Sequence, residues 1–132
     1  MLAVTDSAAV NRYEPSKAPD PAEWLALDEQ EKVVLVEDFH RRAQVDLPNV
    51  KLHATMHVVA ENQLASNDEP VVRALARLIK EGLTRHEAIH AIGSVVAEQI
   101  YDLLKLGDTP ETSRVRYYAA IERLTAAEWR DG

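Results

Sequence analysis

The hydrophobic positions of this chain recur with the spacing of α-helices, and polar or helix-breaking residues separate one segment from the next. An Asp-Pro pair at residues 20–21 predicts the start of a short helix that passes through Trp24. Asp28 and Glu31 have the spacing of a capping box and predict a longer helix to about residue 45. Three further helices are expected over about residues 50–66, 69–82 and 85–106.

The end of the chain predicts one more helix, which Thr109-Pro110 opens and which runs toward Trp129. Apolar and polar residues nowhere alternate between hairpin turns, so no strand is expected. The connections are short, which favours antiparallel neighbours. We therefore expect an all-α protein, a compact antiparallel bundle of about five main helices. Residues 20–132 should form this single domain, and residues 1–19, which lack an apolar period, should form a flexible N-terminal segment.

Length and charge limit the classes of function. A chain of 132 residues that is 46% hydrophobic and 28% charged can bury a core as one domain. The net charge of −7 and the lack of a Lys/Arg cluster argue against nucleic acid and membrane surfaces as partners. The absence of cysteine excludes disulfides and thiolate metal sites. No signal-peptide pattern or membrane-length apolar run is present, so a cytoplasmic protein is expected.

Four of the five histidines form two pairs at four-residue spacing, His53 with His57 and His86 with His90. Side chains four residues apart on a helix lie one turn apart on the same face, so each pair directs two imidazoles to one place. In both predicted helices this face also carries the apolar residues, and the four rings should face the core. Gly93 lies on the same face as His90 and leaves room for a neighbouring helix to approach closely.

Buried imidazoles bring donors and acceptors into the interior, and each unsatisfied one costs about 1–3 kcal/mol. A divalent metal ion resolves this by taking the lone pairs. Glu61 extends the first stripe by one turn, either as a ligand or as an acceptor for a ligand's N–H. Imidazole with carboxylate suits Zn, Fe, Mn, Ni or Cu, and does not suit Ca or Mg. The sequence thus predicts an internal transition-metal site, mono- or dinuclear, built from His53, His57, His86, His90 and Glu61.

Two shorter patterns accompany these pairs. Glu37 and His40 have the Glu-x-x-His spacing of carboxylate-bridged dinuclear bundles, although such bundles carry two copies. His86-Glu87-x-x-His90 matches the H-E-x-x-H pattern of zinc hydrolases, in which the glutamate is the general base. Thr84 and Glu87 also form a capping box, and neither usual continuation of the hydrolase pattern follows His90. A peptidase is therefore the less favoured interpretation, with Glu87 as the candidate catalytic residue.

The two histidine motifs, with Glu61 after the first and a proline-started helix between them, resemble an uncharacterised bacterial family of small all-helical proteins. The resemblance covers about residues 50–105. It implies an all-helical cytosolic domain and marks six positions, but it supplies no reaction. These positions are His53, His57, Glu61, His86, Glu87 and His90.

The function expected from these patterns is that of a metal-dependent hydrolase or oxidase, in which Glu87 or Glu61 carries a proton. The substrate, a small molecule, is not specified by the sequence. The alternative is a metal-free interaction or scaffold module whose histidines are core hydrogen bonders. A homodimer through the last helix is a further expectation. The Tyr117-Tyr118 pair would then lie at the interface, and packing within the core is the other place for it.

Overall fold

The structure, a computed structural model, describes residues 10–45 and 49–131; residues 1–9 of the expected N-terminal segment lie outside it. Within the described residues all regular structure is helical, and five of the helices are long, as predicted. None of the described helices has the length and apolar character that crossing a membrane requires. The helices are α2 (Pro21–Ala26), α3 (Glu29–Arg42), α4 (Val50–Ala65), α5 (Glu69–Lys80), α6 (Arg85–Leu106), α7 (Pro110–Arg123) and α8 (Ala126–Asp131).

The helix starts follow from local sequence. The capping box at α3 forms in both directions: the Glu31 amide donates to Asp28 Oδ1 over 2.8 Å, and the Asp28 amide donates to Glu31 Oε1 over 2.9 Å. The capping box of Thr84 and Glu87 opens α6 in the same way. Gly107 ends α6 with a φ of 68°, a conformation in which glycine has no Cβ penalty.

The last predicted helix is divided into α7 and α8 at Leu124 and Thr125. The guanidinium of Arg77, on α5, donates to the carbonyl oxygens of Ile121 and Leu124 over 2.8 and 2.9 Å, which satisfies the end of α7. Thr125 Oγ1 accepts from the Glu128 amide over 3.1 Å and starts α8. The break is thus fixed by a contact from another helix together with a threonine cap.

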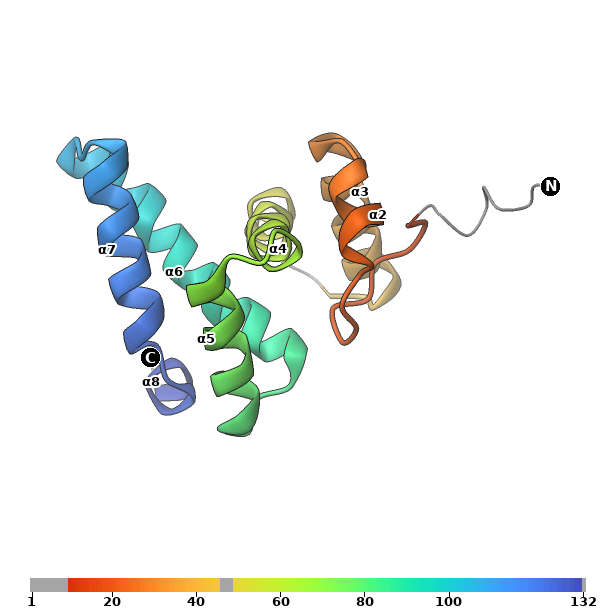
Figure 1. The fold of residues 1–132 in the computed structure, drawn as a ribbon. Coiled ribbons are helices and arrows are strands. Elements are labelled where there is room, and N and C mark those ends of the chain that lie inside the picture. The colour runs from red at the N-terminus through yellow and green to blue at the C-terminus, as the bar shows by residue number, and fades with distance from the viewer. Residues whose placement is uncertain (1–9, 46–48, 132) are drawn as a thin grey trace.

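Helix α4 lies at the centre, with α2 and α3 on one side and α5 and α6 on the other (Figure 1). It separates two apolar clusters. One cluster lies among α4 to α8 and includes Leu78, Ile89, Ile92 and Ile121. The other lies between α4 and the N-terminal helices and consists of Tyr13, Trp24, Val36, Ala54 and Val58. The centre of the molecule is therefore where side chains from α3, α4 and α6 meet.

Residues 10–19 lie against this second cluster, so the core begins before residue 20. Tyr13 is 1% exposed, and its ring centroid lies 5.7 Å from that of Trp24. Arg42 donates to the Tyr13 carbonyl over 3.2 Å, and Arg85 donates to the Pro15 carbonyl over 3.0 Å. The domain boundary expected at residue 20 thus leaves out a segment that contributes a buried aromatic side chain.

Candidate metal site

Histidines from three helices meet between the two apolar clusters: His40 from α3, His53 and His57 from α4, and His86 and His90 from α6. The Nε2 atoms of His53, His57 and His90 form a closed triangle. Their separations are 3.1 Å for His53 to His90, 3.2 Å for His53 to His57, and 3.0 Å for His57 to His90. The two predicted histidine stripes therefore converge through three of their four rings.

His40 is the fourth member of this group: one ring nitrogen from each of His40, His53, His57 and His90 lies within 4.8 Å of the others. Its Nδ1 lies 2.8 Å from the Val36 carbonyl oxygen, which can only accept, so Nδ1 carries the hydrogen. In the neutral ring Nε2 then has a lone pair, and this buried atom has no hydrogen-bond partner in the structure. We call these four residues the histidine cluster.

The ring of His57 is held in the same tautomer by Tyr13. The Tyr13 hydroxyl donates its only hydrogen to Glu61 Oε2 over 2.6 Å, and His57 Nδ1 lies 3.1 Å from the Tyr13 hydroxyl oxygen. His57 Nδ1–H must therefore donate to Tyr13, which leaves the lone pair on Nε2, inside the triangle. Burial, followed by the charge of Glu61, raises the pKa of Tyr13 well above its ordinary value, so the hydroxyl keeps its hydrogen.

Glu61, predicted as a ligand or as an acceptor behind one, is not among the four grouped residues. Its two oxygens accept from Arg85 Nη1 and Nη2 over 2.9 and 2.8 Å, and the side chain is 1% exposed. The ion pair holds the carboxylate where it accepts from Tyr13. Arg85, Glu61 and Tyr13 therefore form a chain that ends on His57, and the metal-ligand group itself contains no carboxylate.

Burial and the neighbouring rings keep the imidazoles of His53, His57 and His90 uncharged. Burial first, and then the charges of the surrounding histidines, lower the pKa of His57 to about 2 and that of His90 to about 4. The pKa of His53 is lowered for the same two reasons. At neutral pH these three rings are thus in the form that binds metal ions.

Hydrogen bonds among the histidines cannot satisfy the triangle. Each Nε2 has one in-plane position, which holds either a hydrogen or a lone pair. Since His57 Nε2 holds a lone pair, any hydrogen must come from His53 or His90. If only one of these two rings carries a hydrogen on Nε2, the Nε2 lone pair of the other faces the lone pair of His57. If both carry one, the two hydrogens face each other. The metal-free arrangement in which histidines satisfy one another therefore leaves at least one close pair unmatched.

Gly93 sets how closely α4 and α6 approach. A Cβ atom at this position would lie 3.2 Å from Met56 Cβ, tighter than ordinary van der Waals contact. Because His90 lies less than one turn from Gly93, this contact brings its ring to the rings of α4, as the sequence predicted. The glycine costs roughly 1 kcal/mol of helix propensity, which the close approach of the two helices explains.

Two other predicted residues lie outside the histidine cluster. The His86 ring is 4.3 Å from that of His90 between centroids, and its buried Nε2 has no hydrogen-bond partner among the described residues, yet His86 is not among the four grouped residues. Glu87 accepts from the Thr84 amide over 2.9 Å in the capping box. The hydrogen bond from the Thr84 backbone lowers the pKa of Glu87, whose carboxylate is therefore charged and engaged at the helix start.

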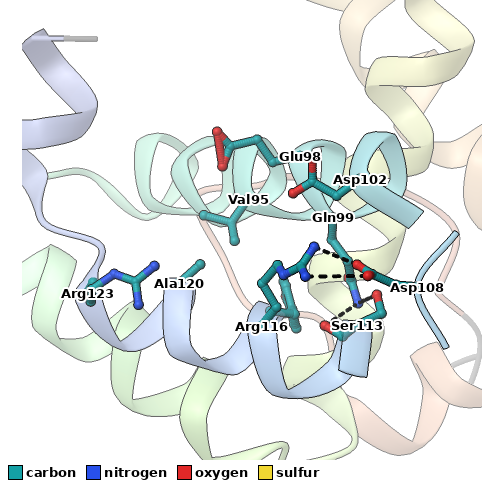
Figure 2. A pocket seen from close by; sticks show the side chains of 10 residues that line it. Val95, Glu98, Gln99, Asp102, Asp108, Ser113, Arg116, Ala120 and Arg123 are labelled. Carbon is teal, nitrogen blue, oxygen red and sulfur yellow. Dashed lines mark hydrogen bonds and ion pairs between the residues drawn. The ribbon is translucent and has the colours of Figure 1, made fainter. Parts of the chain in front are cut away.

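A separate cavity of about 160 Å³ lies between α6 and α7 (Figure 2). Four of its polar side chains form two pairs: Arg116 donates to Asp108 over 2.6 Å, and Gln99 donates to the Ser113 hydroxyl over 3.0 Å. None of its buried side-chain atoms lacks a partner within the described residues. Within the described residues, the buried side-chain atoms without a partner are Nε2 of His40, in the histidine cluster, and Nε2 of His86, beside it.

Comparisons with protein-family models, with curated proteins and with solved structures find no match to this chain. The resemblance to a bacterial family of small helical proteins therefore stays a prediction. What the chain can do must be argued from the histidine cluster itself, a four-histidine group that can hold a metal ion in an all-helical protein.

Proposed function

We propose that this protein binds one divalent transition-metal ion through the Nε2 atoms of His53, His57 and His90, with His40 as the fourth ligand. The observation that carries the proposal is the triangle of Nε2 atoms, 3.0–3.2 Å apart. Three nitrogens bound tetrahedrally to one zinc ion at about 2.0–2.1 Å are about 3.3 Å from one another. The metal-free side chains therefore already lie within a few tenths of an ångström of the arrangement that binding requires.

The fixed tautomers support the same proposal. The hydrogen bonds of His40 to Val36 and of His57 to Tyr13 both occupy Nδ1 and leave Nε2 free. Metal-binding histidines in proteins are generally oriented by such bonds from the other ring nitrogen. Because both acceptors are in place without a metal, little reorganisation is needed when an ion binds.

The donor set selects among metal ions. Neutral imidazoles without a carboxylate favour Zn²⁺, Ni²⁺, Cu²⁺ or Fe²⁺ and disfavour Mg²⁺ and Ca²⁺, which require oxygen ligands. Mn²⁺, which the sequence allowed when Glu61 was counted as a ligand, fits this set less well. When bound, such an ion supplies Lewis-acid chemistry and lowers the pKa of a bound water. The enzyme classes we propose are therefore a hydrolase if the ion is zinc and an oxidase if it is iron or copper.

The test is the metal content of the untagged protein, purified without chelator and measured by inductively coupled plasma mass spectrometry. We expect near-stoichiometric metal in the wild type, on isolation or after dialysis against Zn²⁺, and its loss in His57→Ala and in His90→Ala. His86→Ala is the matched control and should retain the ion, because His86 is outside the cluster. No uptake by the wild type would favour a metal-free module. Loss of metal in His86→Ala would show that the four ligands are misassigned.

A further inference from the structure

A pocket of about 180 Å³ opens on the histidine cluster from the surface between α4 and α6. Three of its lining residues are His53, His57 and His90, whose Nε2 atoms form the triangle. His40 does not line it and is buried behind them. The proposed metal position is therefore enclosed on the side of α3 and reachable from this pocket.

The rest of the pocket lining is apolar and uncharged. It consists of Met56, Ile89, Gly93 and Ala97 together with Ser94, whose hydroxyl donates to the Ala91 carbonyl over 2.7 Å and so has no hydrogen left for a ligand. A carboxylate or phosphate on the body of a ligand, away from the ion, would lose hydration and gain no cationic or donor side chain from the pocket lining. An apolar group is stabilised when it is transferred from water to this lining.

From this lining we infer that the pocket binds a small uncharged ligand. Such a ligand has one donor atom, which is directed at the metal, and an otherwise apolar body. This inference rests on the proposed function, since the donor needs the ion, on which it would take a fifth coordination position beside the four histidines. The size agrees with such a ligand: a cavity of about 150 Å³ in another protein holds benzene. Peptides and nucleotides are excluded as occupants because they are larger than the pocket and carry charged or backbone polar groups.

The experiment uses the full chain loaded with Co²⁺, whose visible absorption bands report a new ligand. The probes are 1-propylimidazole and imidazole-1-acetate, which share the donor and differ chiefly in that the second carries a carboxylate. We expect 1-propylimidazole to change the bands saturably, with a Kd at least about tenfold lower than that of imidazole-1-acetate.

Ala97→Phe tests the position of the ligand, because residue 97 is exposed and lines the pocket. It should retain bound cobalt and weaken 1-propylimidazole at least about tenfold. Ala119→Phe, at an exposed position on α7, is the matched control and should change neither. Stoichiometric cobalt with equal affinity for both probes, or with no effect of Ala97→Phe, would overturn the ligand inference alone. Failure to bind cobalt would overturn the proposed function with it.

Discussion

Replacing Tyr13 with Phe removes one oxygen atom and tests whether residues 10–19 control the proposed metal site. In the wild type this oxygen accepts from His57 Nδ1–H and donates to Glu61. A metal-bound His57 must keep its hydrogen on Nδ1, and in the variant this buried donor has no acceptor. Such a loss costs about 1–3 kcal/mol. In the metal-free variant the His57 hydrogen can move to Nε2 and be donated to His53 or His90. The cost therefore falls on the metal-bound protein and lowers the metal affinity.

The expected result is a metal affinity that falls about 5- to 140-fold, at about tenfold for each 1.4 kcal/mol. Competition for Zn²⁺ with a chromophoric chelator measures it. Tyr117→Phe is the matched control, because Tyr117 is also buried and its hydroxyl donates to Gln63, another α4 side chain, over 2.6 Å. Both variants should lose about 1 kcal/mol of stability in urea denaturation. Equal zinc affinity in the two variants would refute the role assigned to Tyr13.

Two further predictions concern the metal-free protein. The pKa of folded His57 is about 2 against an ordinary value of 6.5, so below about pH 6.5 the unfolded chain binds its proton first. Stability should therefore be unaffected by this group above pH 6.5 and fall below it, by about 1.4 kcal/mol for each pH unit. Urea denaturation of the wild type and of His57→Gln at about pH 7 and pH 5 measures this loss of stability. The variant should lose less than the wild type, and an equal loss in both would contradict the prediction. Arg85→Met should cost about 3–5 kcal/mol because it leaves the buried Glu61 without its ion pair. The exposed pair of Arg73 and Glu122 provides the control: Arg73→Met should cost less than about 1 kcal/mol, and equal costs would count against the buried pair.

The helices were predictable because their signals are local. Caps such as Asp28 with Glu31 and Thr84 with Glu87 lie within one turn of the amide groups they satisfy, so the sequence carries the whole interaction. The break between α7 and α8 depends in part on Arg77, which is 44 residues from Ile121. Thr125 and Glu128 have the spacing of a capping box, and this local signal could have marked the start of α8.

The candidate site was predictable only up to the faces of single helices. Periodicity placed His53, His57 and His90 on inward faces, which the structure brings together. Whether His86 or His40 joins them depends on where α4 crosses α6 and on how α3 packs, and no spacing in the sequence encodes this. The two helices approach closely at Gly93, which is three residues from His90 and seven from His86.

The contacts behind the ligands were not predictable for a related reason. Tyr13 reaches His57 over 44 residues of sequence, from a segment without helical periodicity. Arg85 and Glu61 pair across two helices, so the ion pair appears only when their orientation is known. The sequence signal was the aromatic residue Tyr13 in a polar segment that also contains Pro15 and Pro19, a composition consistent with an anchored segment as well as a flexible one.

X-ray absorption spectroscopy of the zinc-loaded wild-type protein tests the central proposal most directly, because it identifies the atoms bound to the ion. We predict three to four nitrogen ligands at about 2.0–2.1 Å, with the outer-shell scattering of imidazole rings. The same spectrum should be retained in His86→Ala and lost in His57→Ala. A shell made of carboxylate or water oxygens without imidazole scattering would contradict the assignment of His40, His53, His57 and His90 as the metal ligands.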